Sequence, residues 1–106
     1  MSRAIVKSNP AAVVIIQGDH GSKLHLDQGS LKDTDVEEAF STLMCIRAPE
    51  PVTRALYDEM SSVNTFRLVL RGLFEADLPA LPDRSYYSTW EDPLGFEEVT
   101  DRLSAN

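Results

Sequence analysis

The sequence predicts an α/β fold, a partial three-layer sandwich in which helices flank a short, mostly parallel sheet. Residues 11–16, Ala-Ala-Val-Val-Ile-Ile, form an uninterrupted apolar run that is rich in β-branched side chains. Such a run is typical of a strand that is buried on both faces of a parallel sheet. Residues 63–74 place apolar side chains at helical spacing, which predicts an amphipathic helix that packs on the sheet.

Length and composition limit the class of protein. A chain of 106 residues allows one small domain, residues 1–106, because a second domain would need roughly another hundred residues. The hydrophobic content of 42% and the charged content of 25% are ordinary for a globular protein and argue against disorder. The net charge of -7 and the scattered basic residues argue against a nucleic-acid partner, because phosphate contacts need clustered cations.

The single cysteine and the short apolar run exclude further classes. Cys45 has no second cysteine in the chain to bridge to, and we expect it to be a small buried side chain. The longest apolar run, residues 11–16, is far shorter than the roughly 20 residues that span a bilayer. It also lacks the length and the cleavage site of a signal peptide, so neither a membrane span nor a leader is predicted, and the localisation stays open.

The first half of the chain predicts two strands and a short helix. The first strand begins at Pro10 and ends before Gly18, and a loop without apolar periodicity follows over residues 18–35. Thr34 is expected to cap a short helix, with Glu37 three residues later completing a capping box. Residues 42–47 predict the second strand.

The second half predicts helices followed by short extended pieces. Prolines precede a helix over residues 52–60, and a longer helix over residues 63–74 is capped by Ser61 or Ser62 and ended by Pro79. Residues 85–90 have the composition of a strand. A brief extended piece at residues 95–97 and a terminal helix over residues 99–103 complete the prediction.

The candidate site is the Gly18-Asp19-His20-Gly21 segment, where the first strand ends. Ligands of open α/β sheets bind beyond the carboxyl ends of the strands. Asp19 offers a hard oxygen and His20 an imidazole nitrogen, and flanking glycines let the backbone turn so that both reach one ion. An ordinary polar turn is the alternative. The spacing fits neither a phosphate-binding P-loop nor a nucleophile elbow.

Other polar and aromatic residues allow two interpretations each. His25 and Asp27 could join a metal site or lie on the loop surface. Arg67 could bind an anion, although a structural ion pair with a carboxylate is the simpler expectation. The aromatic residues of the 85–90 segment could form a recognition platform, although packing against the helices is the simpler expectation: Tyr86, Tyr87 and Trp90.

Three segments in order carry a resemblance to a known family. They are Pro-Ala-Ala-Val-Val-Ile-Ile-Gln-Gly-Asp-His-Gly-Ser at 10–22, Ser-Ser-Val-Asn-Thr-Phe-Arg-Leu-Val-Leu at 61–70 and Leu-Pro-Asp-Arg-Ser-Tyr-Tyr-Ser at 81–88. Together they resemble the carboxyl-terminal part of sulfatase-like hydrolases and transferases of the alkaline phosphatase superfamily, over nearly the whole chain. The resemblance implies an α/β sandwich around a largely parallel sheet.

The resemblance also implies chemistry. Enzymes of that superfamily cleave or transfer phosphate or sulfate esters with a bound divalent metal, and Asp19 and His20 match the positions of paired metal ligands. The family's nucleophile and its other ligands come from a preceding segment that has no counterpart here. We therefore expect a carboxyl-terminal fragment that does not catalyse alone and that binds Mn²⁺, Zn²⁺, Mg²⁺ or Ca²⁺ weakly if at all, because working sites generally hold three or more protein ligands.

The predicted central strand also implies partners. A strand buried on both faces needs neighbours on both edges, and the chain offers few further strands. We expect self-association through residues 11–16, pairing with a separate upstream polypeptide, or poor solubility. The alternative function is a small acidic module for protein interaction or oligomerisation, without metal or catalysis.

Overall fold

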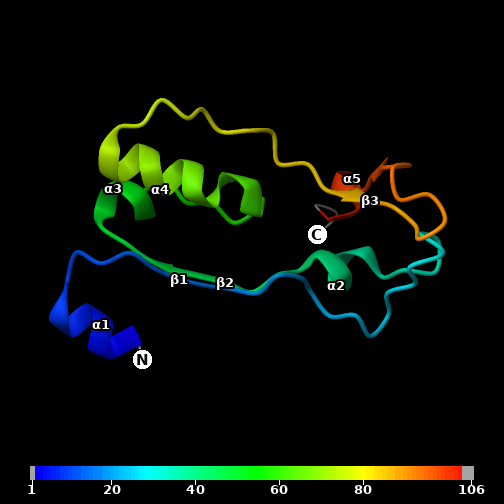
Figure 1. Cartoon of the computed structure of the whole chain (residues 1–106), viewed down its shortest axis with the longest axis horizontal. Coiled ribbons are helices and arrows are strands. Elements are labelled where there is room, and N and C mark those ends of the chain that lie inside the picture. Colours follow the sequence, from blue (N-terminus) through cyan, green and yellow to red (C-terminus); the bar gives the residue numbers. More distant parts are fainter. Residues whose placement is uncertain (1, 104–106) are drawn as a thin grey trace. The chain divides into compact units, whose positions relative to one another are not determined.

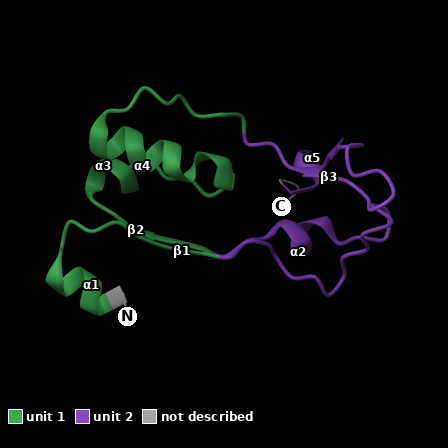
Figure 2. Ribbon diagram, viewed as in Figure 1, with its two compact units in different colours: residues 1–17, 44–82 green, residues 18–43, 83–106 purple. Residues whose placement is uncertain are grey.

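The computed structural model describes residues 2–103, and most of its helices and strands are labelled in Figure 1. Its contacts divide the chain into two compact units, each made of two separate stretches (Figure 2). Unit 1 comprises residues 1–17 and 44–82, and unit 2 comprises residues 18–43 and 83–106.

The sheet of unit 1 is antiparallel, so the predicted mostly parallel sheet is wrong. Strand β1 (Val14–Gln17) pairs with β2 (Met44–Arg47), and Val14 lies opposite Arg47 while Gln17 lies opposite Met44. The second sheet, β3 (Tyr86–Tyr87) with β4 (Glu97–Glu98) in unit 2, is antiparallel too. A continuous apolar run predicts a strand, but it carries no information on the direction of the partner strand.

The expectation of complete burial for the first strand is also wrong. In an antiparallel pair, residues directly opposite one another share a face of the sheet, so Val14 and Ile16 share a face with Cys45 and Arg47. Ile16 is 51% exposed, and Cys45, expected to be buried, is exposed. Within residues 2–103, β1 pairs with β2 alone, so each strand of this sheet keeps an outer edge.

Helix α1 (Ser2–Ser8) is an element that the sequence patterns did not reveal. Seven residues are too few for a convincing helical period, and the segment has no acidic residue in its first turn. Figure 2 shows α1 on one side of the β1–β2 ribbon and the helices of residues 50–74 on the other, all within unit 1.

Helix α3 (Glu50–Thr53) is shorter than the predicted helix over residues 52–60 and begins before it. Pro51 lies in its first turn, where the missing N–H group costs no hydrogen bond. Val52 is completely buried. A Cβ atom added to Gly72 would lie 2.9 Å from Val52 Cγ2, so the absence of a side chain at Gly72 allows this close contact between α3 and the next helix.

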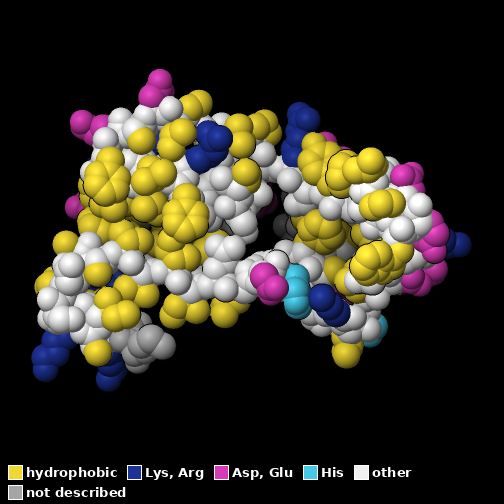
Figure 3. Space-filling model, viewed as in Figure 1, with side chains coloured by type: hydrophobic (Ala, Val, Ile, Leu, Met, Phe, Trp, Pro, Cys, Tyr) yellow, Lys and Arg dark blue, Asp and Glu magenta, His cyan; other side chains and the backbone are white. Residues whose placement is uncertain are grey.

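Helix α4 (Thr65–Phe74), preceded by the 3-10 turn η1 (Ser62–Asn64), confirms the predicted long helix but not its buried face. Its buried residues are Thr65, Leu68 and Val69. Most of the apolar stripe that the sequence predicts to be buried is exposed instead. Its exposed residues are Val63, Phe66, Leu70 and Phe74. Figure 3 shows hydrophobic side chains gathered over α3 and α4. The helix ends at Glu75, whose backbone is left-handed with φ 53°, and not at Pro79.

Unit 2 has a small core under its irregular segments. Val36, Tyr87 and Val99 are buried together, and partly buried apolar side chains pack against them: Leu26, Leu31, Phe40 and Leu103. Helix α2 (Val36–Phe40) supplies Val36, and α5 (Thr100–Leu103) follows Val99. The loop over residues 18–35 holds neither helix nor strand, as expected, and the terminal helix is confirmed.

The cap of α2 differs from the prediction by one residue. Asp35, not Thr34, accepts a hydrogen bond at 3.0 Å from the backbone N–H of Glu38. The Thr34 side chain is buried and instead bonds to Asp27 and Ser30. None of the helices in residues 2–103 combines the length and the apolar character that crossing a bilayer requires.

Asn64 ties the 79–82 connector to α4, and its removal should destabilise unit 1. The buried Asn64 amide donates to Leu81 O and accepts from Leu81 N, both at 2.8 Å. We expect Asn64→Ala to lower the free energy of unfolding by about 1–3 kcal/mol, because both backbone groups lose their partner. Urea denaturation measures this. The exposed neighbour Ser62, changed to Ala, is the control, and equal stability of both variants would contradict the role of Asn64.

Candidate functional site

Asp19 and His20 lie just beyond the β1–β2 pairing. The N–H group of Gly18 donates to Leu43 O at 2.9 Å, so the backbone pairing continues one residue past the two strands. The Asp19 Oδ1 atom lies 3.5 Å from His20 Nε2, and the two side chains are 91% and 49% exposed. Because β1 and β2 are antiparallel, Asp19 and His20 do not lie at the carboxyl edge of a parallel sheet, where the sequence predicts them. What they can bind depends on the geometry of the two side chains alone.

The imidazole of His20 is oriented by the backbone that follows it. Its Nδ1 atom lies 2.6 Å from Gly21 O. A carbonyl oxygen only accepts, so in the neutral imidazole the proton is on Nδ1 and the lone pair is on Nε2. That lone pair is on the ring atom near the Asp19 carboxylate. A histidine that ligates a metal commonly donates its other ring N–H to a backbone carbonyl in this way.

The structure does not bring the other predicted ligands to this pair. His25 pairs with Glu38, and the Asp27 carboxylate accepts from Gly29 N at 2.8 Å. Within residues 2–103, no group of three or more His, Cys, Asp or Glu side chains is arranged to hold a metal ion. The donor set at this place is therefore one oxygen and one nitrogen, which fits part of a divalent-metal site and leaves further ligands to be supplied.

Gly21 is a glycine because of a close backbone approach. Its N–H donates to Ala39 O at 3.0 Å, and an added Cβ atom would lie 2.2 Å from Glu38 O and 2.6 Å from Ala39 O. Neither Gly18 nor Gly21 has a positive φ, so the expected use of glycine for a special turn is wrong at both positions. The contact fixes the residue next to His20 against the end of α2.

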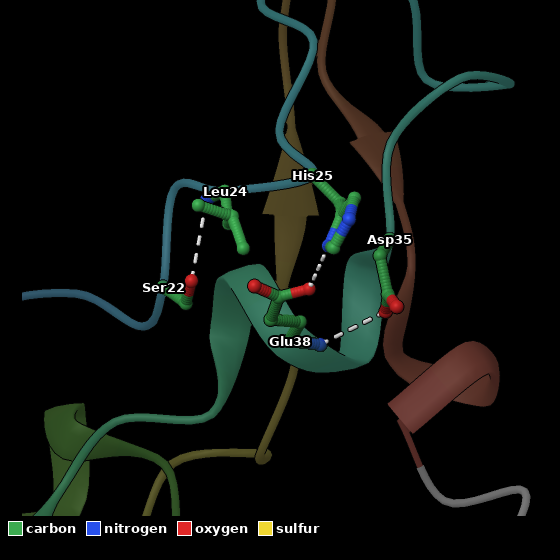
Figure 4. Close-up of polar contacts among 5 residues, drawn as sticks. All are labelled: Ser22, Leu24, His25, Asp35 and Glu38. Carbon is green, nitrogen blue, oxygen red and sulfur yellow. Dashed lines mark hydrogen bonds and ion pairs between the residues drawn. The ribbon is translucent and has the colours of Figure 1, made fainter.

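A second pair, His25 with Glu38, joins the loop to α2 (Figure 4). His25 Nδ1 lies 2.7 Å from Glu38 Oε2. The hydrogen bond and the negative charge of Glu38 raise the pKa of His25. Hydrogen bonds from Ser22 and then from His25 lower the pKa of Glu38. The backbone contributes as well, since Asp35 N donates to His25 O at 2.8 Å.

Sequence reasoning missed this pair because its members are 13 residues apart and belong to no recognised motif. The sequence predicts that Glu38, which follows Glu37, lies in the first turn of a helix, and it leaves His25 as either a metal ligand or a residue of the loop surface. The single sequence signal was the helix start, which places Glu38 near the loop. Both side chains reach solvent, with His25 65% and Glu38 27% exposed, so the arrangement stabilises a surface loop.

The remaining candidates have structural contacts. Arg67 donates a hydrogen bond to Pro79 O at 3.0 Å. Its partner is thus a backbone carbonyl, and neither an anion nor the carboxylate of the expected ion pair. Tyr87 is buried and its hydroxyl donates to Asp27 O, as the packing interpretation expects. Trp90 is 74% exposed and donates to the Gln28 side chain, so packing is wrong for Trp90. Tyr86 instead contacts the Phe96 ring edge-on, with centroids 6.4 Å apart.

Comparison of the chain with protein-family models, with curated proteins and with solved structures finds no match. The resemblance to sulfatase-like enzymes therefore stays a prediction that rests on the three segments quoted above. The geometry of Asp19 and His20 is the structural observation that bears on its chemistry.

The His25–Glu38 pair should make stability depend on pH. The raised pKa of His25 adds stability that is complete below pH 6.5 and is lost as the pH rises through that raised pKa. The lowered pKa of Glu38 adds stability that is complete above pH 4.5 and is lost as the pH falls through that lowered pKa. We expect Glu38→Gln to lower the pKa of His25 in an NMR titration and to destabilise the chain most between pH 4.5 and 6.5.

The His25→Gln background is the control for this titration. There, Glu38→Gln should have a smaller effect on stability, since the partner is already gone. An unchanged pKa of His25 in Glu38→Gln would contradict the pair.

Proposed function

We propose that Asp19 and His20 contribute two metal ligands to a hydrolase or transferase that acts on phosphate or sulfate esters. The observation that carries the proposal is the orientation of His20: Gly21 O holds Nδ1, and Nε2 and Asp19 Oδ1 are 3.5 Å apart. An oxygen and an imidazole nitrogen are ligands that Mn²⁺ and Zn²⁺ accept. The resemblance to sulfatase-like enzymes supports the same assignment.

The exposure of the pair leaves room for a bulky ester substrate. Both side chains are exposed, so an ester bound to a bulky group can approach them without the loop opening. A divalent ion bound there would neutralise negative charge on the transferred phosphoryl or sulfuryl group. The proposal assigns the remaining ligands and the nucleophile to a separate polypeptide segment, because two protein ligands leave an ion mostly hydrated.

Metal titration tests the assignment. We expect the chain to bind Mn²⁺ with a dissociation constant on the order of 1 mM, the weak end of protein metal sites, and to show paramagnetic broadening centred on residues 18–22 in NMR spectra. Asp19→Asn/His20→Gln should weaken binding by about tenfold or more. Glu59→Gln, which removes one exposed carboxylate elsewhere, is the matched control. Broadening that survives in the double variant would contradict the site.

The same proteins are then assayed with p-nitrophenyl phosphate and p-nitrophenyl sulfate. We expect no metal-dependent turnover by the chain alone. Turnover that requires Mn²⁺ and disappears in the double variant would support the metal ligands but contradict the assignment of the nucleophile to another segment.

A second candidate function is oligomerisation without catalysis, and helix α4 favours it. Phe66, Leu70 and Phe74 follow one another at four-residue spacing and are 65%, 36% and 71% exposed. The opposite side of the helix buries Leu68 and Val69. A helix that is apolar on two sides is normally enclosed by protein, and a second copy of the chain would enclose it.

Sedimentation equilibrium tests this second function. We expect a concentration-dependent dimer in physiological salt, where the repulsion between two chains of charge -7 is screened. Phe66→Asp/Phe74→Asp should give a monomer, and Arg71→Asp on the same helix is the control for added negative charge. A monomeric wild-type chain would contradict oligomerisation. Association that persists in the double variant would assign it to the open edge of β1 instead.

A further inference from the structure

A groove of about 420 Å³ lies in unit 1 between helix α1 and one face of the β1–β2 sheet. Its apolar side chains come from Val6 of α1, from Val14 and Ile16 of β1 and from Cys45 of β2. Ile46 of β2 also borders the groove, although its side chain belongs to the opposite face of the sheet. All of these side chains are aliphatic or a small thiol, and none is aromatic. The volume is at the lower end of the range for small-ligand sites, which suits one narrow molecule.

Three cations border the same groove. Arg3 and Lys7 are four residues apart on α1 and so lie on one side of that helix. Arg47 faces them from β2 and also donates to Pro10 O at 3.1 Å. Figure 3 shows basic side chains at the α1 end of unit 1.

The charge around the groove is of one sign. No Asp or Glu occurs in residues 1–18 or 39–49, the stretches that contain every residue of the lining. The overall charge of -7 is therefore misleading at this place, because the nearest acids along the chain are Asp19, Glu38 and Glu50. An anionic group here meets cations without a competing carboxylate among the lining residues.

We propose that this groove binds a small amphipathic anion, an unbranched aliphatic chain that ends in a carboxylate. The aliphatic lining removes the tail from water, at about 25 cal/mol for each Å² of apolar surface buried. The guanidinium groups and the ammonium group pair with the carboxylate. An aromatic or strongly hydrogen-bonding ligand is a poorer fit, because the lining between the cations offers few polar side chains. The inference is independent of the metal site in unit 2.

Cys45 makes the proposal directly measurable. It is the only cysteine of the chain, it is exposed, and it lines the groove. We probe it with iodoacetamide, a neutral reagent that the bordering cations do not attract, and follow alkylation by mass spectrometry. Decanoate, used below the concentration at which it forms micelles, should slow alkylation about threefold at twice its dissociation constant, since the free fraction falls as ligand occupies the site.

Matched ligands and variants distinguish the contribution of the carboxylate head group to binding from that of the aliphatic tail. Butyrate keeps the carboxylate but lacks the tail, and decyltrimethylammonium keeps the tail but reverses the charge, so neither should protect Cys45. Arg3→Gln/Lys7→Gln, at two exposed positions, should abolish protection by decanoate. Arg71→Gln, which removes an exposed cation of α4 outside the lining, should retain it.

NMR provides a second readout that does not depend on cysteine chemistry. Decanoate should shift the methyl signals of Val6, Val14 and Ile16 and leave that of the buried Val69 unchanged. Unaltered alkylation together with unaltered methyl signals would overturn the proposal. Equal protection by decyltrimethylammonium would also overturn it, as would protection that needs vesicles of phosphatidylcholine and phosphatidylglycerol, because the surface would then recognise a tail alone or a membrane.

Discussion

The antiparallel pairing of β1 with β2 is the constraint on which both candidate sites depend. It places Gly18 beside Leu43. The segment between them, which contains a loop and α2, therefore begins and ends at the same place. Asp19 and His20 begin that segment and lie where the pairing stops. On its other side, the pairing places Val14 and Ile16 on the same face as Cys45 and Arg47, which is the floor of the groove. Since a two-stranded sheet is marginally stable by itself, the packing around it must contribute much of its stability.

Sequence patterns predicted where the main elements lie but not how they pair or which side they bury. The apolar run at residues 11–16 does contain a strand, and residues 63–74 do contain a helix. The direction of the partner strand could not be predicted, because a run of β-branched residues suits a parallel and an antiparallel partner equally. The sequence does not predict the buried side of α4, because that side depends on a local contact. Val52 packs against Gly72, and this contact turns Leu68 and Val69 inward and leaves Phe66 and Phe74 exposed. Apolar spacing alone does not contain that information.

The candidate site was predictable only where it is local in sequence. Asp19 and His20 are neighbours in the sequence, and their residue types alone predict metal ligands. The bond from His20 Nδ1 to Gly21 O could not be read from the sequence, although it is what leaves Nε2 available. His25 and Glu38 meet through the path of the loop over 13 residues, and no pattern marks that path. Glycine at position 21 is required by its close contact with the end of α2, and not by the flexibility that the sequence suggests.

Charge is unevenly divided along the chain, so the proposed cation site and the proposed anion site are compatible within one small protein. Unit 2 contains most of the acidic residues, among them Asp19, Asp35 and Glu38, whereas the stretches around the groove contain none. A bound ion responds mainly to the charges nearest to it, because exposed charges separated by more than about 10 Å are largely screened in ordinary salt. A carboxylate at Arg3 and Lys7 therefore has cationic neighbours among the residues that line the groove. The net charge describes the whole chain, so it is uninformative about a single small anion that binds beside local cations.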